Sequence, residues 1–148
     1  MAKRCQDIMT KDPFCGMPTD SVQLIAQLMR DRDVGAVPIC ESPETKRLVG
    51  IVTDRDLALR VVAAGCDPKS ICARDVMTQE LFTCRPEDDL QKALELMERR
   101  QVRRIPIVDR ENRIVGIIAQ ADVATRLKDP QKVTEVVEVI SRPRAAAA

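Results

Sequence analysis

The stretch GIVTDRDL, residues 50–57, decides the fold of this chain because a close copy, GIIAQADV, follows at residues 116–123. Each copy runs from an apolar stretch into a charged segment with helical spacing, which predicts a strand that leads directly into a helix. The glycine, the apolar pair after it and the last Asp recur, whereas Thr53 of the first copy is replaced by Ala119 in the second. The duplication indicates a chain of two related halves.

The repeat extends outward from these two stretches. DIMTKDPF at residues 7–14 matches DVMTQELF at residues 75–82, and the Pro-Ile pair at 38–39 matches that at 106–107. Each half reads as a short apolar segment, a helix, two short strands and a second helix. We expect these elements at 13–15, from about Asp20, 36–40, 48–53 and 54–64 in the first half, and at 81–84, from about Asp88, 104–108, 114–119 and 120–127 in the second.

The pattern predicts an α/β (α+β) protein. We expect two tandem β-α-β-β-α motifs that pack sheet to sheet as one module, because a unit of about 60 residues buries too little core to be stable alone. The expected boundaries are residues 5–65 for the first motif, 73–127 for the second, and 128–148 for a C-terminal helix or tail.

The composition excludes several classes of function. Lys and Arg number 24 against 23 Asp and Glu, a balance that disfavours a protein that coats nucleic acid or an anionic membrane. The chain has no His, which excludes His-based catalytic triads, and its six Cys form no C-x-x-C zinc motif. No apolar run could span a bilayer or serve as a secretory signal. We therefore expect a cytoplasmic protein that requires no metal and contacts no membrane.

The ordered set of motifs, DIMT, VGAVPI and LVGIVTDRDL followed by DVMT, VRRIPIV and IVGIIAQADV, resembles two tandem cystathionine-β-synthase (CBS) domains. The resemblance spans residues 5–127 and extends to the stand-alone CBS-pair proteins of the hypoxic-response type. It implies a non-enzymatic, stress-related regulator or sensor that needs no cofactor and binds an adenosine-containing ligand, namely AMP, ADP, ATP or S-adenosylmethionine. It also implies a homodimer whose state is read by a protein partner that the sequence does not identify.

The same resemblance implies two clefts. In each cleft a carboxylate accepts hydrogen bonds from the ribose hydroxyls, and in the first cleft the Thr53 hydroxyl and the helix start hold phosphate. The first cleft is expected to contain Thr53 and Asp56, facing Val102, Arg103 and Arg104, with Thr78 and Phe82 nearby. The second is expected to contain Asp122 and Arg104, facing Val34, Gly35 and Ala36, with Thr10 and Phe14 nearby. Because Ala119 lacks a hydroxyl, we expect weaker phosphate binding in the second cleft.

Simpler explanations compete with these roles. Thr53 and Asp56 have the spacing of a reciprocal capping box, although the second copy keeps Asp122 without a capping hydroxyl, which favours a ligand role. Arg99 and Arg100 fit a solvated helix end. The arginine-rich run there has no aromatic neighbour, so nucleic-acid binding is disfavoured.

Cys15 and Cys40 fall on segments that are expected to be neighbours, where they are either within disulfide reach or a buried pair of reduced thiols. Three functions therefore remain open. The chain is a sensor of an adenosine-containing ligand, a ligand-free dimerisation or interaction module, or a thiol-redox-responsive protein.

Overall fold

The two pairs of strands expected from the repeat form at the predicted residues. In the first pair, Ala36 lies opposite Thr53 and the ladder is antiparallel, with an irregularity after Ile39. The second pair is the copy of the first, and all four strands are rich in the β-branched residues that pack well in a half-buried sheet. Their bounds are β2 Ala36–Cys40, β3 Leu48–Thr53, β4 Arg104–Val108 and β5 Ile114–Ala119.

The computed structural model describes residues 3–126, so the expected C-terminal helix or tail at 128–148 lies outside the described residues. The described chain forms two compact units. We call residues 3–12, 82–110 and 115–126 unit 1, and residues 13–81 and 111–114 unit 2. The units do not coincide with the sequence repeats, because the first segment of each repeat is built into the unit that the other repeat mainly forms.

This exchange of segments has the same geometry in both units. In unit 1, α1 (Cys5–Ile8) leads to β1 (Thr10–Lys11), which pairs with β5 to give the sheet order β1-β5-β4. Thr10 lies opposite Ile117. In unit 2, α4 (Ala73–Val76) leads to Thr78, which forms an antiparallel bridge to Ile51 of β3.

The strands expected at 13–15 and 81–84 do not form. Each of these extended segments ends in a single parallel bridge, from Gly16 to Ile39 in unit 2 and from Cys84 to Ile107 in unit 1. In unit 2 the segment lies between Pro13 and Pro18, which have no N–H group to donate to a ladder. The true first strand precedes it in the chain.

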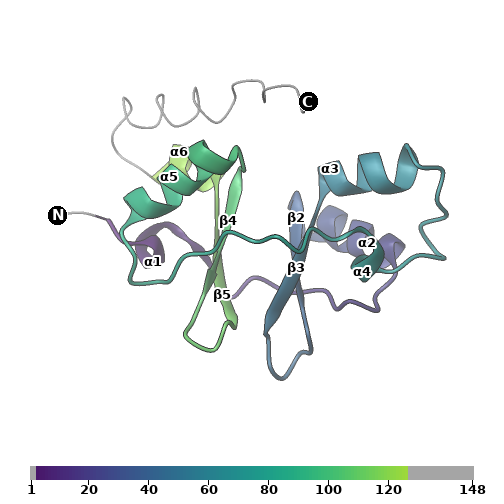
Figure 1. Ribbon diagram of the computed structural model, residues 1–148, viewed down its shortest axis with the longest axis horizontal. Helices are drawn as coiled ribbons and strands as arrows, with labels where there is room; N and C mark the ends of the chain where they lie inside the picture. Colours follow the sequence, from purple (N-terminus) through teal and green to yellow (C-terminus); the bar gives the residue numbers. More distant parts are fainter. Residues whose placement is uncertain (1–2, 127–148) are drawn as a thin grey trace. The chain divides into compact units, whose positions relative to one another are not determined.

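The expected helices form and lie on one side of the strands in each unit (Figure 1). The long helices begin two residues after Asp20 and Asp88, because Ser21 and Asp89 are the N-caps and accept hydrogen bonds from first-turn N–H groups. The helix after β3 changes from α to π, and Gly65 follows it with a φ of 70°. The bounds are α2 Val22–Arg32, α3 Asp54–Leu57, η1 Ala58–Val62, α5 Leu90–Arg100 and α6 Gln120–Arg126.

Each unit has its own apolar core, and two methionines join the exchanged segments to the strands. A Cβ atom on Gly50 of β3 would lie 2.5 Å from the Sδ atom of Met77, and one on Gly116 of β5 would lie 2.4 Å from that of Met9. Each repeated glycine therefore makes room for the methionine of the MT motif from the other repeat.

Candidate functional site

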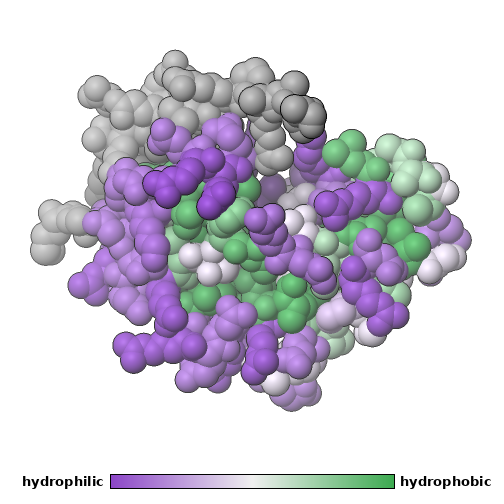
Figure 2. Space-filling view, viewed as in Figure 1, coloured by the Kyte–Doolittle hydropathy of each residue, from purple (hydrophilic) through white to green (hydrophobic). Residues whose placement is uncertain are grey.

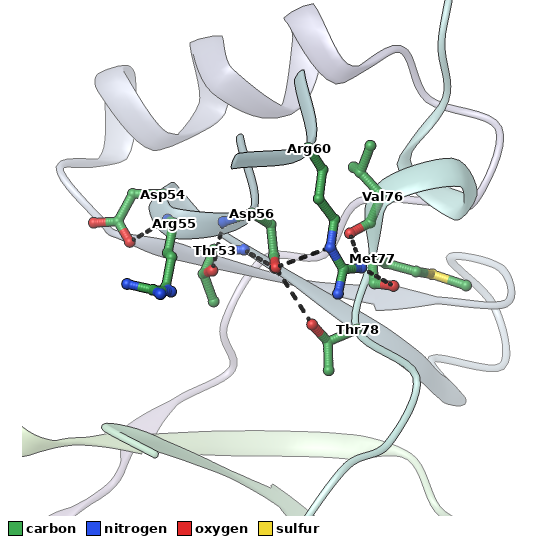
Figure 3. Close-up of polar contacts among 8 residues, drawn as sticks. All are labelled: Thr53, Asp54, Arg55, Asp56, Arg60, Val76, Met77 and Thr78. Carbon is green, nitrogen blue, oxygen red and sulfur yellow. Dashed lines mark hydrogen bonds and ion pairs between the residues drawn. The ribbon is translucent and has the colours of Figure 1, made fainter. Parts of the chain in front are cut away.

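The junction between β3 and α3 is fixed by a reciprocal capping box (Figure 3). The Asp56 N–H donates to the Thr53 hydroxyl oxygen at 3.1 Å, and the Thr53 N–H donates to Oδ2 of Asp56 at 2.9 Å. The strand therefore ends and the helix begins within one hydrogen-bonded ring. This arrangement holds the Asp56 carboxylate in one orientation.

The second oxygen of Asp56 has only long contacts. The Thr78 hydroxyl donates to Oδ1 at 3.4 Å, and Nε of Arg60 lies 3.9 Å from the same atom. Arg60 also donates to the carbonyl oxygens of Val76 at 2.9 Å and Met77 at 3.4 Å, so it joins the exchanged α4 segment to the carboxylate (Figure 3). The Asp56 side chain is 12% exposed, so most of it is buried among these partners.

Unit 1 repeats this arrangement without the capping hydroxyl. The Ala119 N–H donates to Oδ2 of Asp122 at 2.8 Å, and the Thr10 hydroxyl lies 3.5 Å from Oδ1 of Asp122. The carboxylate half of the capping box thus persists without the hydroxyl half. The hydrogen bond from Ala119 is a second reason for an acid at that position, so the ligand role of Asp122 stays a prediction.

The structure places the other expected site residues within one unit or the other. In unit 2, Ala36 lies opposite Thr53 and the Asp54 N–H donates to the Gly35 carbonyl at 2.9 Å. Val34 is 38% exposed beside them. Asp122 belongs to unit 1, so the expected approach of Val34, Gly35 and Ala36 to Asp122 stays a prediction.

The equivalent residues in unit 1 follow the same plan. The Gln120 N–H donates to the Arg103 carbonyl at 2.9 Å, Val102 packs against the apolar core, and Arg104 is half-buried at the start of β4. The expected approach of these residues to Asp56 of unit 2 likewise stays a prediction.

Both phenylalanines lie under an arginine of the long helix in their own unit. The guanidinium of Arg32 is 4.8 Å from the ring centroid of Phe14, and that of Arg100 is 4.7 Å from that of Phe82. These distances are within the range of cation–π contacts. Arg100 is exposed at the end of α5, as expected, and its contact with Phe82 adds to that interpretation. The matched spacing of Phe and Arg in the two repeats was the signal that could have revealed the contact.

Sequence reasoning also missed Arg60 as a partner of Asp56. The two residues are four positions apart on one helix, where side chains of opposite charge meet. The repeat contains the same spacing at Asp122 and Arg126, which was a visible signal.

Cys15 and Cys40 are free thiols that contact each other, as the pairing of their segments predicted. The hydrogen bond between them lowers the pKa of Cys15 and raises that of Cys40. This contact is compatible with either state of the pair, so a disulfide there stays a prediction.

The described part of the chain can be compared with the requirements of a metal site and of a membrane-spanning helix. Within residues 3–126, no group of three or more His, Cys, Asp or Glu side chains could hold a metal ion. The helices of that region are also too short or too polar to cross a bilayer.

Comparison with known proteins identifies the family. The CBS domain profile matches residues 5–63 and 73–129, which together make up most of the chain. The chain belongs to the CBS domain family. CBS domain pairs are regulatory modules. Each of the two CBS domains in this chain contains one of the strand-to-helix junctions described above.

Similar proteins include other CBS pairs. Hypoxic response protein 1 of Mycobacterium tuberculosis is 35% identical over 142 residues, which cover 96% of each chain. A crystal structure of Hypoxic Response Protein I with two coordinated zinc ions superimposes with a TM-score of 0.75 over 84% of this chain and 99% of the other, at 35% identity. The CBS domain pair of protein MJ0100 superimposes with a TM-score of 0.76 over 84% of this chain and 95% of the other. At 23% identity, that likeness concerns the fold alone.

Proposed function

We propose that this CBS pair is a non-enzymatic regulatory sensor that binds an adenosine-containing ligand at Asp56 and Asp122. The observation that carries the proposal is the doubled carboxylate. In each unit, one Asp oxygen is held by the backbone N–H at a strand end, and the other receives a long contact from a Thr hydroxyl, joined in unit 2 by the distant Arg60. Such a carboxylate is oriented in advance and keeps acceptor capacity.

A ribose supplies the groups that this carboxylate lacks. Two neighbouring hydroxyls can donate to one carboxylate, which is how an acidic residue recognises ribose in dinucleotide-binding folds. The contacts to Oδ1 of Asp56, at 3.4 Å from Thr78 and 3.9 Å from Arg60, are longer than good hydrogen bonds. Ribose hydroxyls can therefore replace them at little cost.

A phosphate group would distinguish the two units. The Thr53 oxygen accepts the Asp56 N–H, so the hydroxyl hydrogen remains able to donate to a phosphate oxygen. Ala119 has no such donor. We expect phosphorylated adenosine to prefer the Asp56 site.

Known proteins guide the choice of test ligands. The CBS pair of MJ0100 was solved in complex with 5′-methylthioadenosine and S-adenosylmethionine. The ligand of the present chain is a proposal, so a panel should contain both of these molecules together with adenosine, AMP, ADP and ATP.

Isothermal titration calorimetry with this panel tests the proposal. Asp56→Asn keeps the shape of the side chain and an oxygen for the Thr53 N–H but removes the charge, so the affinity of the first site should fall by at least about tenfold, which is 1.4 kcal/mol. Asp122→Asn should have the same effect on the second site. Asp54→Asn, at an exposed position two residues away, is the matched control and should bind like the parent protein.

Two results would contradict the proposal. One is the absence of heat with every ligand in the panel, and the other is equal weakening by Asp54→Asn and Asp56→Asn. The first result would favour the second candidate function, a ligand-free dimerisation or interaction module.

A surface of unit 2 supports self-association in either case. Leu59 is 52% exposed and Val62 is 78% exposed, three residues apart on η1. Figure 2 shows apolar surface over the part of unit 2 where α3 and η1 run. Large exposed apolar side chains that lie together are typical of interaction sites, so we propose a homodimer that uses this surface.

A further inference from the structure

A second pair of cysteines lies in the core of unit 1. Cys5 of α1 is 0% exposed and Cys84 is 2% exposed, and both belong to the same apolar cluster. The Cys5 thiol lies 3.9 Å from the Asp89 carbonyl oxygen, and the interaction between the two thiols shifts the pKa of both. The two residues are 79 positions apart in the chain, so only the tertiary structure brings them together.

Backbone hydrogen bonds hold the two segments in this position. The Cys5 N–H donates to the Asp88 carbonyl at 2.9 Å, the Gln6 N–H to the Pro86 carbonyl at 3.0 Å, and the Leu90 N–H to the Lys3 carbonyl at 2.8 Å. The segment that carries Cys5 is therefore fixed alongside the segment that follows Cys84. A disulfide requires such close backbones, because its two Cα atoms are typically about 4.4–6.8 Å apart.

The repeat shows that the fold does not need sulfur at these positions. The residues of unit 2 that are equivalent to Cys5 and Cys84 are Ala73 and Gly16, and Ala73 is also 0% exposed. The thiol contact of unit 2, between Cys15 and Cys40, occupies different positions of the same fold. The cysteine pair of each unit therefore has no equivalent in the other unit.

The two thiols differ in pKa. The hydrogen bond from Cys5 lowers the pKa of Cys84, against the opposing effect of burial, and the same hydrogen bond raises the pKa of Cys5. A thiolate is the nucleophile in disulfide exchange, so Cys84 is the residue that attacks first.

We propose that Cys5 and Cys84 form a redox-modification site that closes to an intramolecular disulfide in the presence of a small disulfide oxidant. The Cys84 thiolate attacks one sulfur of glutathione disulfide, which forms a mixed disulfide and releases one glutathione thiolate. Cys5 then loses its proton and attacks the Cys84 sulfur, which releases the second glutathione. The protein loses two electrons and two protons, and the oxidant becomes two thiols.

Formation of the Cys5–Cys84 disulfide would affect the proposed site at Asp122. Cys5 begins α1, and the same short segment continues to Thr10, whose hydroxyl lies 3.5 Å from Asp122. A disulfide at Cys5 would fix this segment on unit 1 and so restrict the position of Thr10. This consequence, unlike the disulfide itself, rests on the proposed ligand function.

Peptide mapping tests the disulfide directly. The Cys15→Ser/Cys40→Ser variant removes the other pair, and it is brought to equilibrium in glutathione buffers from the reduced folded state and by refolding from urea. After acid quenching, alkylation and digestion, we expect a linked Cys5–Cys84 peptide and the loss of two free thiols. The oxidised form should melt about 10 °C higher than the reduced form, because the crosslink closes a long loop.

The matched control adds Cys5→Ala, the residue that unit 2 contains at the equivalent position. Its melting temperature should not change with the redox buffer. Free Cys5 and Cys84 after refolding in glutathione disulfide would overturn the proposal, as would mixed glutathione disulfides without the crosslink. Refolding gives the oxidant access to both thiols, so burial cannot explain such a result.

The link to ligand binding has a separate readout. If the proposed function holds, titration of the Asp56→Asn protein with the same ligand panel should give different affinities for the reduced and the disulfide-closed forms. Binding by neither form would contradict the proposed function and would leave the mapped disulfide intact.

Discussion

Thr53 and Ala119 occupy equivalent positions in the two units, so the two junctions can be compared within one chain. Both are followed three residues later by an Asp whose Oδ2 accepts their backbone N–H. Only Thr53 adds the hydroxyl that accepts the Asp56 N–H. The capping boxes of the two junctions therefore differ by one hydroxyl group, which stabilises the helix start and has a proposed role in binding.

Replacing Thr53 by Ala should separate these two roles. Loss of the cap should lower the free energy of unfolding by about 1 kcal/mol in urea denaturation, and Thr53→Ser should restore it. In calorimetry the variant should lose more affinity for AMP than for adenosine, because only AMP has a phosphate. Equal losses for the two ligands would limit Thr53 to capping. Ala119→Thr is the reverse test and should increase the preference of the second site for AMP.

Gly50 and Met77 should show strong coupling in a double-mutant cycle. A Cβ on Gly50 would meet the Sδ and Cγ atoms of Met77 at 2.5 and 2.9 Å, so Gly50→Ala should destabilise the protein by about 1–3 kcal/mol. In a Met77→Ala background the same change should cost less, because the obstructing atoms are absent. Additive effects in urea denaturation would show that the glycine has another role.

At the scale of elements, the four long strands were predictable and the short one was not. Residues 36–40, 48–53, 104–108 and 114–119 are apolar and β-branched, and this local pattern settles their conformation. β1 has two exposed polar residues, Thr10 and Lys11, and it is a strand only because β5 offers it hydrogen bonds. No local pattern reveals such a partner, which explains why the apolar segment at 13–15 was expected to be the strand instead.

Arg60 should hold the exchanged segment of unit 2 in place. Its guanidinium donates to the carbonyls of Val76 and Met77, next to the bridge that joins Thr78 to Ile51. Arg60→Ala should therefore increase hydrogen exchange of the Thr78 amide by roughly tenfold, since a charged donor to the end of α4 is lost. Arg60→Lys should restore part of the protection, and Arg55→Ala, at an exposed position nearby, should leave it unchanged. An unaltered Thr78 amide in Arg60→Ala would contradict this role.

At the scale of the whole molecule, the two compact units depend on both repeats. Cutting the chain between the repeats would separate α1 and β1 from β5, and α4 from β3, because each segment is built into the unit of the other repeat. Because the repeats exchange these segments, we expect the pair of repeats, and not the single motif, to be the smallest part of the chain that folds. This explains why a single repeat would have too little core.

The proposed homodimer can be tested on its apolar surface. Val62→Glu places a charge on a side chain that is 78% exposed, so it should not disturb the core, but it should oppose burial against a second copy. In sedimentation velocity we expect the parent chain to be dimeric and Val62→Glu to be largely monomeric at micromolar concentration. Gln91→Glu adds the same charge at an exposed position of α5 and should remain dimeric. A dimer in both variants would place the interface elsewhere.

The sequence by itself determined the duplication, the order of helices and strands, and the positions of Thr53, Asp56 and Asp122 at strand-to-helix junctions. These features follow from periodicity and capping patterns, which act over a few residues. The resemblance to CBS domains added the expectation that Thr78 lies near Asp56 and Thr10 near Asp122, and the structure brings both pairs together.

Only the tertiary structure decided which segments pair across the chain. The exchange of α1 and α4, the contact of Arg60 with Val76 and Met77, and the meeting of Cys5 with Cys84 all join residues that are far apart in sequence or share no local pattern. Backbone hydrogen bonds have nearly the same energy for any two extended segments, so the partner is chosen by the core that the whole chain can bury. That choice brings each carboxylate to a threonine of the other repeat.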